Sequence, residues 1–466
     1  MSIDPDSEEL SLTERVRENP GPAMKWFAGA LLLFALEAGA VVNFVTGLFG
    51  PGVELPTLLS RDVISNLGYQ NPDTGVWHGT FMGLSPAYAW ALRVVLVYTY
   101  AAICVWWLWR GYLVFREHYR YADWTPRDDM IDRLRGHRWG QFGVIIVFAF
   151  VVMAMFAPAL GPTTVERTIS NPYSYHIDYY NESGQLDNVT VGQANLGARS
   201  QGTPDQNVGP MEYDEFGRFH PFGTMPTGKD MFTFMAAGAR ISLFIGLVSI
   251  GVSGFIAVAF ALLTAYYKGL IDLAVVIAGD SIMSLPRLLF VMLLTVVLGN
   301  HWIGEIYSGG FLLALIFAAT GWPFLWRAVR GPAMQVSEQE WIDAAKSFGQ
   351  RPRVTMRKHM APYILGYLLV YASMSLGGII IAVAGLSFLG LGINPPTPEW
   401  GRAVDIGQSY VTTASWHISF IPGVMIVLVV TAFNALGDGI RDAIDPQSET
   451  GDGEGAEVAA AGGGGA

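Results

Sequence analysis

Eight stretches of predominantly apolar residues follow one another along the chain, with polar segments between them. They cover residues 24–49, 88–115, 139–160, 238–266, 271–298, 310–329, 361–387 and 416–436. Each reaches the length of about 20 residues that an α-helix needs to cross roughly 30 Å of hydrocarbon. The pattern therefore predicts an all-α, polytopic membrane protein with eight spans.

Composition agrees with this prediction, because 52% of the 466 residues are hydrophobic and only 14% are charged. The net charge of −11 comes largely from the termini and the outer loops, which excludes a basic nucleic-acid surface. An acidic segment precedes the first apolar stretch, where a cleaved signal peptide would have a short basic region. The one cysteine, Cys104, lies within a predicted span, so no intrachain disulfide is expected.

The distribution of Lys and Arg predicts the orientation of the spans. Several of these residues lie in the connections 116–138 and 351–358, whereas residues 50–87 contain only Arg61 and residues 389–415 only Arg402. Because positively charged loops are retained in the cytoplasm, the first two connections are predicted to be cytoplasmic. Both termini are then expected inside the cell.

Residues 163–227 form a long polar loop on the predicted outer face, where a small ordered cap is expected. Asn181 and Asn188 each begin an Asn-x-Ser/Thr pattern there, so both are candidate glycosylation sites. Chance occurrence of these short patterns explains them equally well. The Gly-rich tail, residues 448–466, has too little apolar surface to fold and is expected to be disordered.

The segment from Gly223 to Asp230 comes close to a phosphate-binding loop. Asp230 replaces the hydroxyl residue that would hold magnesium, and no β-strand is predicted before the segment. Catalytic motifs and metal-ligand spacings are also missing from the sequence. We therefore expect no catalytic residue, no metal site and no cofactor bound by this chain.

The most informative segment is polar and lies between the sixth and seventh spans. Ser337 and Glu340 have the spacing of a capping box, and Gly349 suits a left-handed helix stop. The segment therefore predicts a helix of about 11 residues, roughly 16 Å long.

One face of this predicted helix is apolar with small residues at its centre. Trp341, Ala344, Ala345 and Phe348 recur at spacings of three and four residues. Small residues allow the backbone of a partner protein to approach closely, so the helix would fit a groove in another protein. An amphipathic helix lying on the membrane surface fits the same pattern equally well.

The same residues resemble the EAA loop of ABC importer permeases. The match is Asp343-Ala344-Ala345, then Gly349, then Pro362. In that family the loop forms a coupling helix that docks into the ATPase subunit. The resemblance implies ATPase-coupling roles for a set of seven residues, which are Glu340, Asp343, Ala344, Ala345, Phe348, Gly349 and Pro362. Asp343 departs from the usual Glu but keeps its charge.

Further motifs resemble the C-type permease of dipeptide, oligopeptide and nickel importers. They are Gly238-Ala-Arg-Ile-Ser-Leu243, Ser387-Phe-Leu-Gly-Leu-Gly392, Trp400-Gly401 and the stretch from Phe433 to Pro446. The resemblance covers roughly residues 135–447. It implies a six-span permease core, preceded by a polar tail at residues 1–23 and a two-span extension at residues 24–134.

This sequence departs from the family in the predicted outer segment at residues 228–234. Phe234 stands there in place of the second basic residue of the family's motif. This departure puts contacts of that segment with a binding protein or a second permease in doubt.

The resemblance implies a permease subunit that is not itself an enzyme and that works by alternating access. Its implied partners are a second, B-type permease, two ATP-binding subunits that hold ATP-Mg, and an extracytoplasmic substrate-binding protein. Di- or oligopeptides are the implied substrates, and nickel or another small solute is an alternative. A permease-like receptor or scaffold without transport is the rival hypothesis, which the retained coupling helix argues against.

Four charged residues within or near predicted spans need an explanation. Asp280 and Arg287 flank a Ser-Ile-Met-Ser-Leu-Pro segment and are candidates for the translocation path, for pairing with each other or for helix anchoring. Glu37 and Arg93 would pair with each other or lie at the membrane interfaces and snorkel, and we favour snorkelling.

Overall fold

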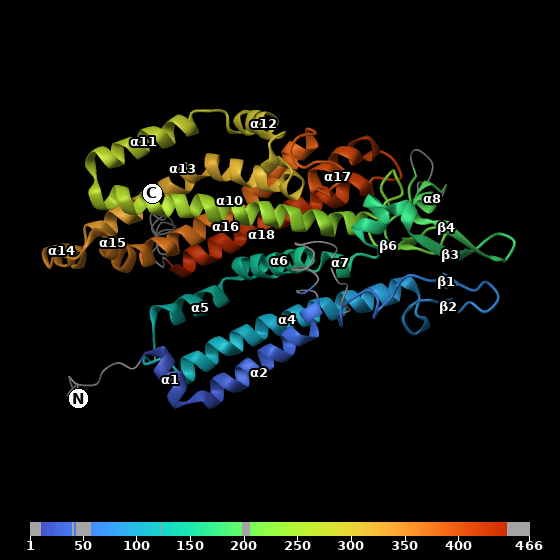
Figure 1. The fold of residues 1–466 in the computed structure, drawn as a ribbon, viewed down its shortest axis with the longest axis horizontal. Coiled ribbons are helices and arrows are strands. Elements are labelled where there is room, and N and C mark those ends of the chain that lie inside the picture. The colour runs from blue at the N-terminus through green and yellow to red at the C-terminus, as the bar shows by residue number, and fades with distance from the viewer. Residues whose placement is uncertain (1–10, 40–41, 43–56, 123, 198–205, 445–466) are drawn as a thin grey trace, which may run out of the picture. The chain divides into compact units, whose positions relative to one another are not determined.

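The structure is a computed structural model that describes residues 11–39, 42, 57–122, 124–197 and 206–444 (Figure 1). Its contacts divide the chain into two compact units. The first comprises Met1–Asp128, Ile177–Val189 and Phe216–Phe219, and the second comprises Asp129–His176, Thr190–Glu215 and His220–Ala466. The expected tail at residues 448–466 lies outside the described residues.

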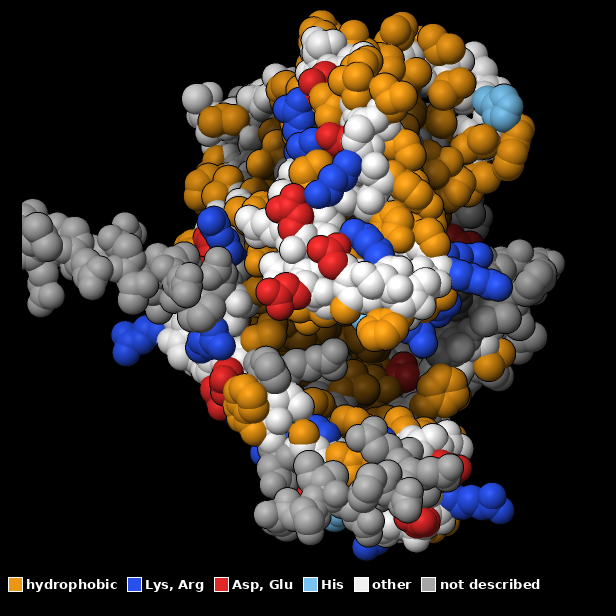
Figure 2. Space-filling model, turned by 90° about the vertical axis from the view of Figure 1, so that its left-hand side faces the viewer, with side chains coloured by type: hydrophobic (Ala, Val, Ile, Leu, Met, Phe, Trp, Pro, Cys, Tyr) orange, Lys and Arg blue, Asp and Glu red, His pale blue; other side chains and the backbone are white. Residues whose placement is uncertain are grey.

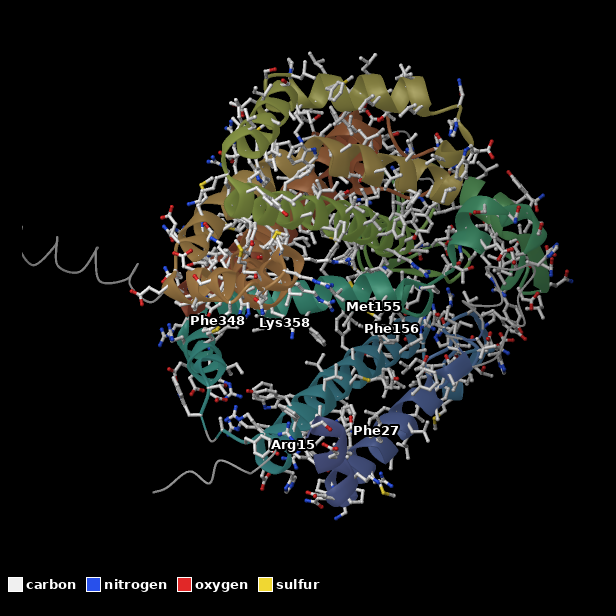
Figure 3. All side chains as sticks on the ribbon, turned by 60° about the vertical axis from the view of Figure 1, so that its left-hand side comes forward. Arg15, Phe27, Met155, Phe156, Phe348 and Lys358 are labelled. Atoms are coloured by element: carbon white, nitrogen blue, oxygen red, sulfur yellow. The ribbon has the colours of Figure 1, made fainter. Side chains whose placement is uncertain are left out.

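The first unit contains a helical hairpin. Its helices are α1 (Leu12–Glu18), α2 (Pro20–Leu36) and α4 (Pro86–His118). Two tryptophans join α2 to α4 reciprocally, because the indole of Trp26 donates to the Trp107 carbonyl at 3.0 Å and that of Trp107 donates to the Trp26 carbonyl at 3.1 Å. Figure 3 labels Phe27 on α2 and Arg15 on α1. Phe27 is 64% exposed, as expected of a side chain that faces lipid.

Short strands and aromatic rings form the other end of the first unit. The elements are β1 (Tyr69–Gln70), β2 (Trp77–His78), η1 (Phe81–Gly83), β3 (His176–Tyr180) and β4 (Leu186–Thr190). β1 pairs antiparallel with β2, and Tyr69 lies opposite His78. The Tyr69 ring also meets that of Tyr180 on β3 at 5.8 Å. The hairpin before α4 thus packs against part of the predicted outer loop.

The second unit contains most of the helices. Its long helices are α6 (Arg138–Met155), α10 (Met231–Tyr267), α11 (Gly269–Met283), α12 (Arg287–Leu298), α13 (Gly310–Ser337), α16 (Ala361–Phe388) and α18 (His417–Ile444). The shorter helices are α7 (Ala157–Leu160), η2 (Glu166–Ser170), η3 (Pro172–Ser174), α8 (Val191–Leu196), η4 (Trp302–Gly304), η5 (Ile306–Gly309), α14 (Glu340–Ser347), α15 (Pro352–Thr355), η6 (Met356–Met360), α17 (Trp400–Gly407) and η7 (Gln408–Tyr410). The remaining elements are α5 (Pro126–Gly136), β5 (Glu212–Tyr213) and β6 (Phe219–His220).

Among the described residues, six helical segments are long and apolar enough to cross a membrane. They are Pro86–His118, Arg138–Met155, Met231–Tyr267, Ile306–Ser337, Pro352–Phe388 and His417–Ile444. Of the predicted span at residues 24–49, the structure describes α2, a shorter apolar helix of 17 residues, and part of the rest lies outside the described residues.

The predicted span at residues 271–298 is not a single helix. The structure breaks it into α11 and α12, which are bent by 84°. Pro286 explains the break, because a proline disfavours helical geometry in the residue before it and cannot donate a backbone hydrogen bond. α12 therefore begins only at Arg287.

The core of the second unit lies along α10 and α13, the most extensively paired helices. Small side chains of α10, such as Ala257 and Ala261, are fully buried against Trp326 and Val329 of α13. A similarly close contact joins α6 to α18, because a Cβ atom added at Gly143 would lie 2.5 Å from the Leu436 nitrogen. Small residues thus bring helix backbones close together, as is common between membrane helices.

Candidate functional site

The predicted coupling segment contains a helix that is shorter than expected. α14 has eight residues, and its N-cap is Gln339, whose side chain makes no capping hydrogen bond. The predicted capping box at Ser337 is wrong because α13 continues to that residue. The Ser337 hydroxyl donates to the Met334 carbonyl at 2.8 Å, inside α13. The helix therefore begins two residues later than the sequence suggested, with its N-cap at Gln339 instead of Ser337.

The end of α14 lies where the sequence placed it. Gly349 has a φ of +72°, in the left-handed region. Its amide donates to the Lys346 carbonyl at 2.9 Å, and the Gln350 amide donates to the Ala345 carbonyl at 3.0 Å. This pair of hydrogen bonds is a Schellman motif, which stops the helix and leaves Phe348 at its tip.

The predicted apolar stripe of α14 is largely exposed. Trp341 is 46% and Phe348 91% exposed, and Ala344 between them is exposed as well. Ala345 is half-buried, whereas Glu340 and Asp343 are exposed. Figure 3 shows Phe348 at the same end of this unit as Lys358. The exposed face is available to a partner protein.

A residue outside the predicted stripe holds α14 in place. Ile342 is fully buried, in a cluster that includes Ala265 of α10, Val329 of α13 and Ile364 of α16. The adjoining Trp341 ring stacks with Tyr363 at 6.1 Å between centroids. Displacement of α14 would therefore disturb a cluster that is shared by three long helices. Sequence reasoning missed Ile342, although an apolar residue off the exposed stripe of a short helix is the available signal.

Polar contacts join the coupling segment to the turn between α10 and α11. Lys268 pairs with Glu338 at 3.1 Å, and the ammonium group of Lys346 lies 5.4 Å from the centre of the Tyr266 ring. Lys346 also contacts Asp343 at 3.4 Å. These exposed contacts are individually weak, so they can exchange when a partner binds.

The loop after α14 is basic and leads into α16. Arg353, Arg357 and Lys358 line a hollow together with Val354. Figure 2 shows the end of the molecule where α14 and α15 lie in Figure 1, and Lys and Arg alternate there with Asp and Glu. Pro362 lies in the first turn of α16, where its missing N–H costs no hydrogen bond.

Asp280 and Arg287 are not brought together as a pair. Asp280 forms an ion pair with Arg327 of α13, and both side chains are about half-exposed. The guanidinium of Arg287 instead lies over the rings of Phe317 and Phe324, at 5.8 and 5.4 Å. Sequence reasoning missed Arg327, although a charged residue inside a predicted span was the signal.

Glu37 and Arg93 are buried, so the prediction that they snorkel is wrong. Glu37 is 9% exposed and accepts a hydrogen bond from the Leu59 amide at 3.1 Å. Arg93 is fully buried and donates to the Ile64 carbonyl at 2.7 Å. Both side chains hold the segment before α4 by binding its backbone.

The candidate glycosylation sites lie on the hairpin of β3 and β4. The side-chain oxygen of Asn181 accepts hydrogen bonds from the amides of Ser183 and Gln185, both at 3.0 Å. Asn188 is exposed and donates to Asp178 at 3.3 Å. The outer loop is thus ordered around both asparagines.

The N-terminal end of α10, which we call the outer end after the predicted topology, carries a buried charge cluster that sequence reasoning missed. Asp230 caps the helix by accepting from the Thr233 amide at 2.7 Å. His220 lies between Asp230, at 2.9 Å, and Asp214, at 3.4 Å. Burial by itself lowers the pKa of His220, but the hydrogen bonds and charges of the two aspartates raise it above its usual value. Sequence analysis singled out Asp230 only as the residue that departs from a phosphate-binding loop.

Comparison with known proteins agrees with these features. Residues 257–449 match the family model of the binding-protein-dependent transport system inner membrane component. Residues 125–182 match the N-terminal transmembrane domain of oligopeptide transport permease C.

Curated relatives match over most of their length. A dipeptide transport system permease protein of Bacillus subtilis is 30% identical over 342 residues, which cover 72% of this chain and 92% of the relative. A glutathione transport system permease protein of Shigella dysenteriae is 30% identical over 69% of this chain and 91% of the relative. An oligopeptide transport system permease protein of Haemophilus influenzae is 33% identical over 49% of this chain and 71% of the relative.

The six apolar helices of the described residues and the family match define the class of the protein, which is a multi-pass membrane transport permease. Within that class, the chain belongs to the family of binding-protein-dependent inner-membrane permeases of ABC importers.

Proposed function

We propose that this chain is the C-type permease subunit of an ATP-driven importer of di- or oligopeptides. The names of its relatives support the substrate class, since they are dipeptide, oligopeptide and glutathione permeases. The chain lies in the cell membrane with both termini in the cytoplasm, in agreement with its Lys- and Arg-rich connections.

The observation that carries this proposal is the construction of α14. Its exposed stripe ends in Phe348, and its opposite side is anchored by the fully buried Ile342. This helix docks into an ATP-binding subunit through Trp341, Ala344 and Phe348. Because Ile342 contacts a cluster shared by α10, α13 and α16, closure of the ATPases is transmitted to the spans.

The proposed complex contains a second, B-type permease, two ATP-binding subunits and an extracytoplasmic binding protein. ATP-Mg is bound and hydrolysed in the partner subunits, and this chain supplies half of the translocation path. Docking of α14 must differ between the open and closed ATPase states, because a contact of equal strength in both shifts no equilibrium.

The test uses the complex reconstituted in proteoliposomes, with dipeptide uptake and ATP hydrolysis as readouts. Phe348→Ala removes the most exposed side chain of the stripe, and we expect a loss of uptake on the order of tenfold, as for a hot-spot residue. Gly349→Pro removes the left-handed stop and should abolish coupling.

Phe420→Ala is the matched control. Phe420 is 59% exposed, but it lies in the first turn of α18, outside the coupling segment. It should transport like the wild type. Normal coupling in both α14 variants would contradict the docking role. Absence of uptake by the wild-type complex would contradict the transport function and favour a receptor or scaffold.

A further inference from the structure

Helix α11 is attached to the second unit in an unusual way. Gly279 is its one buried residue within the described structure, whereas Leu270 is 84% and Ile277 58% exposed. A Cβ atom added at Gly279 would lie 3.5 Å from Pro323 and 3.6 Å from Trp326. Besides this contact, Val275, Val276 and Ile282 of α11 are only partly buried against the cluster that contains Trp326 and Val329 of α13.

Two ion pairs join α11 to α13. Arg330 binds Asp272 with both its Nε and NH2 groups, and the Nε to Oδ1 distance is 2.8 Å. Arg327 binds Asp280 across the two helices through a single contact, from its NH2 group to Oδ1. Asp272 and Asp280 are two helical turns apart, so both lie on the side of α11 that faces α13.

The arginines of both ion pairs lie within a long apolar helix. Both arginines belong to a segment that crosses the membrane. Charges at that depth are costly when they face lipid, so they pair and line protein or water-filled surfaces. The Asp272–Arg330 pair is the more enclosed of the two, since its side chains are 19% and 31% exposed, whereas those of Asp280 and Arg327 are about half-exposed.

The base of α11 also touches the coupling segment. Lys268, directly before α11, pairs with Glu338, and Tyr266 lies under the Lys346 ammonium group. At its other end, α11 meets the break before α12, which is bent by 84°. α11 is therefore a short rod with a contact to the coupling segment at one end and a bend at the other.

We infer that the pairs Asp272–Arg330 and Asp280–Arg327 form a latch that makes α11 move together with α13 when α14 is displaced. This inference rests on the proposed function, and it makes Arg327 and Arg330 positioning residues for transport. On this inference, α11 lines the translocation path. It moves together with α13 as one rigid body.

Charge exchange tests the latch in the reconstituted complex, with dipeptide uptake per ATP hydrolysed as the readout. Asp280→Arg or Arg327→Asp alone places two like charges together, so we expect uptake to fall at least about tenfold. The double variant Asp280→Arg/Arg327→Asp should recover a large part of the wild-type ratio. Arg138→Asp, a charge reversal at an exposed residue outside the latch, should retain it.

A double variant no better than the single ones would overturn the latch, provided that it folds. A chemical cross-link outside the ion pairs covers the case in which it does not fold. In a Cys104→Ser background, Leu273→Cys/Gln335→Cys is joined by a bifunctional maleimide long enough to span the two exposed positions. Because the latch predicts that the helices move as one body, the cross-linked complex should transport like the complex before cross-linking. Loss of transport on cross-linking would show that they slide, and would overturn the inference.

Distance measurements separate this inference from the proposed substrate. Spin labels at Leu273 of α11 and Gln335 of α13, both exposed, report their separation without any peptide. The latch predicts the same distance in nucleotide-free and ATP-bound complexes, and a shift of about 5 Å, one helical turn, would overturn it. Lack of dipeptide uptake by the wild type would contradict the proposed transport function, and it would leave this distance measurement unaffected.

Discussion

The two ends of the second unit differ in how deeply their charged side chains are buried. At the outer end, His220 and Glu399 are almost completely buried, and Asp214 and Asp230 enclose the histidine. At the coupling end, the Lys268–Glu338 pair is exposed, and its side chains retain 52% and 68% of their accessible surface. Buried pairs are costly to break, whereas exposed pairs exchange readily. The outer end is therefore built to stay fixed and the coupling end to rearrange.

The largest effect is expected from His220→Ala. The substitution leaves the buried Asp214 and Asp230 without the imidazole between them. Loss of one partner from a buried ion pair costs about 3–5 kcal/mol, so the free energy of unfolding should fall by that amount. Thermal unfolding of the purified protein measures it, and His301→Ala, at an exposed residue, is the control.

The same cluster gives stability a pH dependence. The pKa of His220 is raised in the folded protein, despite its burial, by Asp214 and Asp230. Its stabilising contribution is therefore complete below about pH 6.5, the unfolded value, and is lost as the pH rises through the folded pKa. His220→Gln should remove this slope. An identical pH profile in wild type and variant would contradict the assignment.

Glu399 should give the next largest effect, with the opposite sign. Burial raises its pKa to about 7, from 4.5. The neutral acid is therefore favoured in the folded state, and above pH 7 ionised Glu399 costs on the order of 3 kcal/mol. Glu399→Gln should raise the unfolding temperature at pH 8 and change it little near pH 4. Destabilisation at pH 8 would show that the carboxylate is held by favourable charges instead.

Trp400→Phe tests a neutral contact at the same end. The Trp400 indole is fully buried and donates to the Met235 carbonyl at 2.7 Å. Phenylalanine would remove this hydrogen bond, at a cost of about 0.5–1.5 kcal/mol, because the Met235 carbonyl lies inside α10 and keeps its helical partner. Thermal unfolding should show the loss, whereas Trp416→Phe, at a residue 47% exposed, should not.

The smallest effect on stability is expected at the coupling end. Lys268→Gln removes an exposed ion pair with Glu338, which is worth less than about 1 kcal/mol. The unfolding temperature should hardly change, while uptake per ATP falls if this contact matters for coupling. A loss of stability as large as that of His220→Ala would remove the contrast between the two ends.

Helix types and most spans could be predicted from the sequence, because apolar length alone determines whether a segment can cross a bilayer. The break at Pro286 was missed since the apolar stretch continues on both sides of it. The start of α14 was also missed. Ser337 and Glu340 have the spacing of a capping box, but tertiary packing extends α13 through Ser337.

The exposed face of the candidate site could be predicted, whereas its attachments could not. Phe348 and Gly349 follow from local spacing and from the conformational freedom of glycine. Ile342, Arg327 and Arg330 depend on which helices lie beside them, and one sequence carries no such information. The partners of Asp280 and His220 are likewise distant along the chain.

Helix α10 extends over 37 residues, or about 55 Å at 1.5 Å per residue. Its first turn is capped by Asp230 in the histidine cluster, and its last turn ends beside Lys268. A rod of that length works as a lever: with its outer end fixed, a tilt of about 5° moves its inner end by about 5 Å. Docking that shifts the coupling segment by a few ångströms would thus change the angle at which α10 leaves the fixed outer end.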